Sequence, residues 1–173
     1  VAVRTTRGDY RPEQVVLAAG SWTPAVARDL RLDLPVQPAK GYSVTFDKPE
    51  NCPAVPLMLA EGRMGVTPMG PLMRLAGTLE LSGINLRIDS RRVGALLRTA
   101  DDYLVADIAS MSGKTWCGMR PATPDTVPII GRTDSYSNLF IATGPSMTGV
   151  TLGPVTGKLI AQLACDQEPI VDP

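Results

Sequence analysis

The most regular hydrophobic pattern in the chain lies near its C-terminal end, between residues 138 and 163. The run Leu139–Ala142 is short and apolar, which is typical of a buried strand. Gly144 and Gly149 bound a turn, after which apolar residues recur at helical spacing. The pattern predicts a strand, a turn and a helix, an arrangement that can present N–H groups of the helix N-terminus to a ligand. A turn of this kind without a ligand is equally common, so the glycines leave both interpretations open.

The first 34 residues predict a second buried strand. Residues 14–20 are apolar and end in small residues, as buried parallel strands do. Residues 1–4 predict another strand, and residues 7–12 predict a turn. Thr23 is placed to cap a short helix over residues 25–30.

The pattern changes to that of an antiparallel sheet after residue 34. Prolines within residues 34–41 predict an extended linker. Short turns separate the apolar runs that follow, and short turns favour antiparallel pairing. The expected strands are residues 42–46, 55–60, 64–67 and 72–76.

The last part of this middle region predicts one helix and a returning strand. Residues 89–104 have the period of an amphipathic helix, with Asp89 or Ser90 as the N-cap. A strand is expected at residues 114–120, a proline-fixed loop at 121–128, a short strand at 129–132 and a turn at 136–138.

Composition and charge exclude several functions. The 173 residues contain 17 Lys and Arg and 17 Asp and Glu, and this zero net charge argues against a nucleic-acid surface. The chain has no histidine, which excludes Ser-His-Asp and Cys-His catalysis within it. Its three cysteines are scattered, so we expect neither a disulfide framework nor a metal site. No apolar run approaches the roughly 20 residues that span a bilayer. The strand-like start without Met suggests a fragment.

Arg120 is the charged residue with the clearest chemical potential. It ends an apolar run and precedes Pro121, and a guanidinium at the floor of a pocket can hold a carboxylate in bidentate fashion. The alternative is a surface or ion-paired arginine, which composition alone favours. Composition likewise predicts that Trp22 packs in a core and that Lys40 is solvated.

Four segments resemble the C-terminal half of FAD-dependent amine oxidoreductases, the family of D-amino acid oxidase, glycine oxidase and bacterial D-amino acid dehydrogenase. They are residues 15–22, 35–42, 118–132 and 138–163, and they follow the order of the family. The resemblance implies a fold of the α+β or α/β class. In it, the C-terminal portion of a Rossmann-like FAD-binding domain, residues 1–34 and 121–173, is interleaved with an antiparallel-sheet substrate domain, residues 35–120.

The same resemblance implies the site residues. Arg120 would hold the substrate carboxylate as the catalytic residue. The family's cysteine that tethers flavin covalently would fall at Gly118, with Cys117 one residue away, so we expect non-covalent FAD. The implied cofactor-binding residues are Ala19, Gly20, Trp22, Gly144, Met147, Thr148, Gly149, Val150 and Thr151.

Two features of the chain depart from the family pattern. The family often has histidine where Pro145 stands. Its N-terminal dinucleotide-binding unit, with the glycine-rich loop that holds the ADP half of FAD, is absent from this sequence. The absence of that unit should leave sheet edges exposed.

The implied function is FAD-dependent oxidative deamination of D-amino acids, in amino acid catabolism, by hydride transfer from substrate carbon to flavin. A glycine or sarcosine-type amine oxidase stays open, as does a non-catalytic truncated chain or subunit that needs a partner to supply the nucleotide-binding half. The expected partners are a small amino acid substrate and the N-terminal half of the same enzyme. We expect a cytoplasmic protein and leave open peripheral association with the inner face of the membrane through a quinone acceptor.

Overall fold

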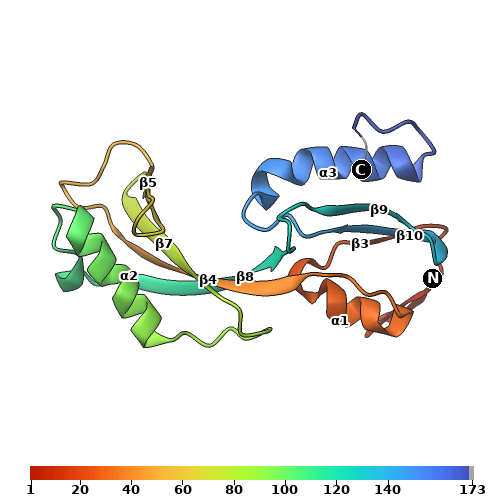
Figure 1. Cartoon of the computed structure of the whole chain (residues 1–173), viewed down its shortest axis with the longest axis horizontal. Helices are drawn as coiled ribbons and strands as arrows, with labels where there is room; N and C mark the ends of the chain where they lie inside the picture. The colour runs from red at the N-terminus through yellow and green to blue at the C-terminus, as the bar shows by residue number, and fades with distance from the viewer. Residues whose placement is uncertain (172–173) are drawn as a thin grey trace. The chain divides into compact units, whose positions relative to one another are not determined.

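The computed structural model describes residues 1–171, which form two compact units. Unit 1 contains Val1–Pro38 and the chain from Arg120 onward, and unit 2 contains Ala39–Met119. Strands β4 (Gln37–Asp47) and β8 (Lys114–Ala122) contain the two points at which the chain passes between the units. Figure 1 labels the elements of both units, which are described separately below.

Unit 1 is built on a three-stranded sheet with the order β3-β10-β9. The short strand β3 (Val15–Leu17) runs parallel to β10 (Tyr136–Thr143), and β9 (Ile129–Thr133) runs antiparallel to it. In the central strand β10, Leu139, Phe140 and Ile141 are all buried because both faces of the sheet are covered. Helix α3 (Gly149–Ala164) lies on one face and α1 (Thr23–Ala27) on the other (Figure 1).

Three consecutive helical elements cover residues 20–30, between β3 and the next strand. A 3₁₀ turn, η1 (Gly20–Trp22), leads into α1, and a second one, η2 (Arg28–Leu30), follows it. The predicted capping role of Thr23 is wrong. Trp22 occupies the cap position and Thr23 is the first helical residue, with its hydroxyl engaged elsewhere. Ala27 is fully buried against Leu17 and Ile141, which fixes α1 on the sheet.

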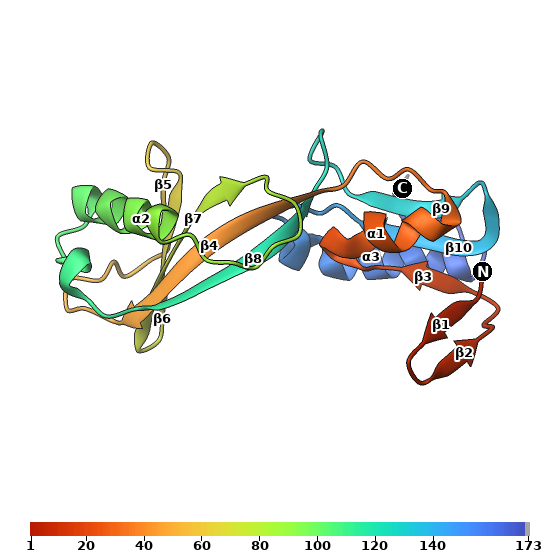
Figure 2. The ribbon, with the colours of Figure 1, turned by 90° about the horizontal axis from the view of Figure 1, so that it is seen from below.

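The N-terminal residues form a separate hairpin of β1 (Val3–Thr5) and β2 (Gly8–Tyr10), seen in Figure 2. Residues 8–10 are therefore strand rather than the predicted turn. The reversal falls earlier, where the Thr5 hydroxyl donates to the carbonyl of Gly8 and accepts from the amide of Arg7.

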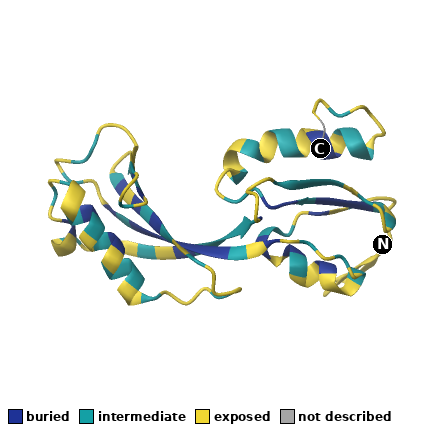
Figure 3. Cartoon of the chain, viewed as in Figure 1, coloured by how far each residue is buried: buried dark blue, intermediate teal, exposed yellow. Residues whose placement is uncertain are grey.

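Unit 2 is an antiparallel sheet with the strand order β5-β6-β7-β4-β8, covered by one helix. The antiparallel pairing predicted from the short turns is confirmed for β5 (Leu57–Leu59) with β6 (Met64–Met69) and for β6 with β7 (Leu72–Glu80). Helix α2 (Ser90–Tyr103) buries Leu96 and Ala100 in the core of this unit. Figure 3 shows the buried positions recurring along the helix and the strands. The predicted Asp89 cap is confirmed, because its carboxylate accepts from the amide of Arg91 at 2.9 Å.

Several elements are longer than their apolar runs predict. Residues 37–41, expected as linker, belong to β4, which pairs with β7 from Lys40 to Asp47. Residues 121–122 extend β8 into the predicted loop, and Tyr136 opens β10 where a turn was expected. In each strand, main-chain pairing carries on beyond the hydrophobic positions. A 3₁₀ turn, η3 (Ile108–Ser110), completes unit 2. Among the described residues, no helix combines the length and apolar character needed to cross a bilayer.

Candidate functional site

The carboxyl ends of the two parallel strands of unit 1 lie side by side. The pairing of β3 with β10 ends at Leu17 and Ile141, and the chain then turns at Gly20 and Gly144, whose φ values are +54° and +81°. A Cβ on Gly144 would lie 2.6 Å from Cγ2 of Thr123, so a larger residue has no room. The sequence therefore folds both predicted cofactor segments, 19–22 and 144–151, toward one edge of the sheet, which is where α/β folds bind ligands.

Helix α3 begins at this edge without a side-chain cap. Thr148 stands at the cap position, but its hydroxyl donates to the carbonyl of Pro145 at 2.8 Å and accepts no helix amide. The first amides of the helix are thus left for another acceptor, and the positive end of the helix dipole faces the same way. Trp22, Met147 and Val150 are 45%, 78% and 95% exposed, so the predicted cofactor surface is open rather than packed in a core.

Arg120 lies on β8 directly before Pro121, and Pro121 is hydrogen-bonded to the turn that follows Gly144. The amide of Ser146 donates to the carbonyl of Pro121 at 3.0 Å, which ties the end of β8 to the segment after Gly144. The Nη1 atom of Arg120 is buried and has no hydrogen-bond partner among residues 1–171. Burial lowers the pKa of Arg120, but arginine titrates so high that it stays charged. This Nη1 atom is therefore neither solvated nor ion-paired within residues 1–171, and an anion would satisfy it.

A second buried polar atom also lacks a partner. The hydroxyl of Ser21, which is only 2% exposed, makes no hydrogen bond within the described part of the chain. Ser21 lies between the predicted cofactor residues Gly20 and Trp22. Since an unsatisfied buried hydroxyl is unfavourable, this turn also fits a polar group from outside the chain.

An apolar cleft of about 290 Å³ lies between the sheet and α3. Val16 of β3 and Ala18, just after this strand, line one side of it, and Gly149, Gly153 and Gly157 of α3 line the other. Apart from the nearby backbone of α3 and the adjacent residues, no atom of residues 1–171 lies within 4 Å of the positions that a Cβ on Gly153 or Gly157 would take. Because β3 is the outer strand of its sheet and Val16 is 45% exposed, the open edge expected from the sequence is present here.

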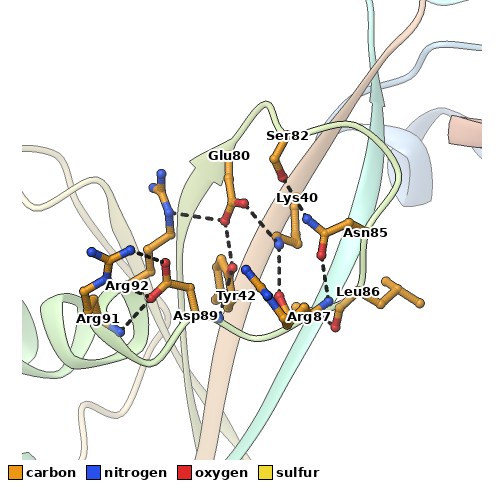
Figure 4. Close-up of polar contacts among 11 residues, drawn as sticks. Lys40, Tyr42, Glu80, Ser82, Asn85, Leu86, Arg87, Asp89, Arg91 and Arg92 are labelled. Carbon is orange, nitrogen blue, oxygen red and sulfur yellow. Dashed lines mark hydrogen bonds and ion pairs between the residues drawn. The ribbon is translucent and has the colours of Figure 1, made fainter.

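Unit 2 contains a buried ionic cluster that the sequence did not reveal. Lys40 is 1% exposed, so the prediction of a solvated lysine is wrong. Its Nζ donates to the carbonyl of Arg87 at 2.9 Å and lies 3.2 Å from Oε1 of Glu80. Figure 4 shows the Tyr42 hydroxyl donating to the other oxygen of Glu80, at 2.7 Å, with Arg92 beside it. The cluster fixes the segment between β7 and α2 against β4.

The pKa shifts of this cluster have identifiable causes. Burial by itself lowers the pKa of Lys40, but hydrogen bonding with Tyr42 and Glu80 outweighs it, so the pKa of Lys40 is raised. Hydrogen bonds from Ser82 and Tyr42, with Lys40 in addition, lower the pKa of Glu80 to about 2. A lysine between Ala39 and Gly41 carries no signal for such a partner, because Glu80 is 40 residues away in the sequence.

The two residues nearest the family's covalent flavin position, Cys117 and Gly118, offer no accessible thiol. Cys117 is 9% exposed, and its thiol donates to the carbonyl of Leu86 at 3.2 Å. Gly118 lies under the ring of Trp116, where a Cβ would come within 2.1 Å. This packing leaves no room for a cysteine at position 118 without moving Trp116.

The chain is similar to known proteins over almost its whole length. The family described as FAD dependent oxidoreductase (DAO) matches residues 1–163. The chain is 35% identical to a D-amino acid dehydrogenase of Agrobacterium fabrum, over 99% of this chain and 41% of the relative. It is 34% identical to a glycine oxidase of Pseudomonas aeruginosa, over 100% of this chain and 47% of the relative. It thus spans less than half the length of either relative.

The fold agrees with these sequence matches. The crystal structure of glycine oxidase from Geobacillus kaustophilus superposes with a TM-score of 0.90 at 29% identity, over 99% of this chain and 46% of that one. The expected fold class, part of an FAD-binding fold joined to an antiparallel sheet, is confirmed by this match. On the matched residues and the shared fold, the chain belongs to the family of FAD-dependent oxidoreductases.

Proposed function

We propose that this chain is the part of an FAD-dependent D-amino acid dehydrogenase or oxidase that binds the substrate and the ring end of the cofactor. The reaction is oxidative deamination, in which an amino acid becomes an imino acid that water hydrolyses to a keto acid and ammonia. The single observation that carries the proposal is Arg120, whose buried Nη1 has no partner among the described residues. Relatives named D-amino acid dehydrogenase support the same assignment.

The residues at the ends of β3 and β10 fit a bound FAD. When bound, FAD supplies the acceptor for the hydride of the substrate carbon. The uncapped amides of Gly149, Val150 and Thr151 stabilise negative charge placed at the helix N-terminus. Gly20 and Gly144 let the main chain approach the cofactor closely, and the indole of Trp22 offers an exposed apolar surface. Cys117 is engaged with Leu86, which supports non-covalent binding.

Arg120 acts by orientation in this proposal. Its guanidinium holds the substrate carboxylate through charge-assisted hydrogen bonds and so fixes the amine-bearing carbon. Catalysis by positioning needs no protein nucleophile and no histidine, which suits the composition of the chain. Unit 1 corresponds in this assignment to the FAD domain, expected at residues 1–34 and 121–173, of which the last two lie outside the described residues. Unit 2 corresponds to the substrate domain, expected at residues 35–120, except that residues 35–38 and Arg120 belong to unit 1.

We also propose that the working enzyme contains a nucleotide-binding half in addition to this chain. The D-amino acid dehydrogenase of Agrobacterium fabrum and the glycine oxidase of Pseudomonas aeruginosa are each more than twice as long as the matched region. The outer strand β3 can pair with a further parallel strand, and the cleft beside Gly153 and Gly157 can accept the helix that would follow such a strand. In a full enzyme, this half supplies the contacts to the ADP end of FAD.

Glycine or a secondary amine such as sarcosine is the second candidate substrate. The observation that favours it is the superposition on glycine oxidase. Both substrates carry the carboxylate that Arg120 would bind, so the arginine does not distinguish them. A rate comparison of D-alanine, glycine and sarcosine separates the two candidates, and a parallel comparison of oxygen with a soluble quinone decides between the two electron acceptors that the sequence leaves open.

The first experiment is a titration of the chain with FAD, followed by Trp fluorescence and flavin absorbance. Saturable binding and anaerobic bleaching of the flavin band by D-alanine would support a complete site. If this chain alone does not bind, the titration is repeated with the N-terminal half of a relative supplied. The absence of FAD binding in that mixture and in the full-length protein would contradict the proposed function.

A further inference from the structure

We propose that Thr143 and Thr23 are positioning residues, whose hydroxyl groups hold the two strand ends at the spacing that FAD requires. The inference rests on the proposed function, because it concerns the same cofactor site. Thr23 Oγ1 donates to Thr143 Oγ1 at 3.1 Å, and Thr143 Oγ1 donates to the carbonyl of Gly20 at 3.1 Å. Together, these two bonds form a hydroxyl chain from α1, through the end of β10, to the turn after β3.

The hydroxyl chain lies where the sheet itself no longer holds the strands together. Strand β3 has only three residues, and its register with β10 ends at Leu17 and Ile141. Gly20 and Thr143 lie beyond that pair, at the positions where the two segments begin to turn. The two side-chain bonds therefore extend the contact between the strands to the edge at which the cofactor residues emerge.

Each member of the hydroxyl chain is next to a proposed cofactor residue. Thr143 precedes Gly144, Thr23 follows Trp22, and the acceptor is Gly20 itself. Gly20 and Gly144 both have positive φ. Because glycine has no Cβ, its backbone can adopt many conformations, and contacts with other residues hold these two turns in place. The hydrogen bond from Thr143 to Gly20 holds these two turns at a fixed distance, although they are 124 positions apart in the numbering.

Burial makes the link strong and specific. Thr23 is 0% exposed and Thr143 is 2% exposed, so water does not compete for these bonds. Valine has nearly the shape of threonine but no hydroxyl, so Thr143→Val removes both bonds without leaving a large cavity. The carbonyl of Gly20 and the hydroxyl of Thr23 would then lose their partner.

The test compares Thr143→Val with Thr143→Ser and Thr23→Val in the full-length protein. The matched control is Thr133→Val, because the Thr133 hydroxyl also bonds main-chain carbonyls, those of Tyr136 and Leu139, but lies at the opposite end of the sheet. We expect Thr143→Val to raise the Kd for FAD about tenfold, Thr23→Val less, and Thr143→Ser to restore the wild-type value. Thr133→Val should lower the melting temperature and leave the Kd unchanged.

Amide hydrogen exchange of the cofactor-free protein gives a readout that does not depend on FAD. In Thr143→Val, the amides of residues 144–148 should exchange faster, while those of the β9-β10 hairpin stay as in wild type. An unchanged Kd in a folded Thr143→Val protein, or a loss equal to that of Thr133→Val, would overturn the positioning role. Failure of Thr143→Ser to restore the affinity would overturn it as well. A wild-type protein without FAD affinity would instead contradict the proposed function, and the inference with it.

Discussion

The amide of Ser146 donates a 3.0 Å hydrogen bond to the carbonyl oxygen of Pro121. Through this bond, the residue after Arg120 is attached to the turn that leads from Gly144 into α3. The proposed carboxylate-binding arginine and the proposed cofactor turn therefore belong to one locally connected piece of unit 1. A substitution in either one is therefore expected to shift the position of the other.

Replacing Arg120 should remove substrate binding without removing the cofactor. We expect Arg120→Ala to lower kcat/KM for the amino acid by about 100-fold or more, because a buried charge-assisted contact to the carboxylate is lost. Arg120→Lys should recover only part of this loss, since lysine cannot form the bidentate pair. Steady-state kinetics with an FAD titration of each variant checks this. An Arg120→Ala protein with wild-type kcat/KM would show that the carboxylate binds elsewhere.

Gly144 should tolerate no side chain. Gly144→Ala places a Cβ 2.6 Å from Thr123 at a φ of +81°, and we expect a loss of about 1–3 kcal/mol in the free energy of unfolding, with weaker FAD binding. The control is Gly94→Ala within α2, where a Cβ would lie 3.3 Å from the flexible end of the Arg98 side chain. That variant should gain about 0.5–1 kcal/mol from helix propensity. Denaturant unfolding measures the free energy of unfolding of both variants. An equal change in this free energy for Gly144→Ala and Gly94→Ala would contradict the strain expected at Gly144.

Glu80 should make the stability of unit 2 depend on acidic pH. Its pKa is about 2 in the folded protein, below its ordinary value of 4.5, so the unfolded chain takes up the proton first. The stabilisation is therefore complete above about pH 5 and declines as the pH falls toward 2. The difference in unfolding free energy between wild type and Glu80→Gln should shrink over this range. A difference that stays constant with pH would mean that the carboxylate is not stabilised as proposed.

The cleft beside α3 should be sensitive only when the nucleotide-binding half is present. Gly157 faces open space in this chain, so Gly157→Leu should leave its folding nearly unchanged. In the full-length protein, the same change should lower the melting temperature and weaken FAD binding, because the added side chain fills the cleft. Lys158→Leu, on the exposed neighbouring position of the helix, is the matched control. Equal behaviour of both variants in the full-length protein would contradict docking at this cleft.

The apolar periodicity was sufficient for the elements whose burial repeats along the sequence. Local spacing predicts helix α2 with its Asp89 cap, the strand before Gly144 and helix α3. In each of them, the apolar positions are the ones that face the core, so their spacing indicates the type of element. The order of four short motifs was also enough to indicate the family that the comparisons establish. These features depend on residues that are near one another in the chain.

Hydrogen bonds and ion pairs between residues far apart in the chain could not be predicted from this local spacing. The burial of Lys40 depends on Glu80, and the hydroxyl chain depends on Thr23 meeting Thr143, 120 residues later. The residue type of a lysine or a threonine does not indicate whether a distant residue forms a hydrogen bond or an ion pair with it. The unpartnered Nη1 of Arg120 likewise emerges only when the surrounding chain has removed water from it. The sequence alone thus determined the family and the elements with regular apolar spacing, while burial and hydrogen bonding between distant segments, which exist only after folding, decided the surroundings of the candidate site residues.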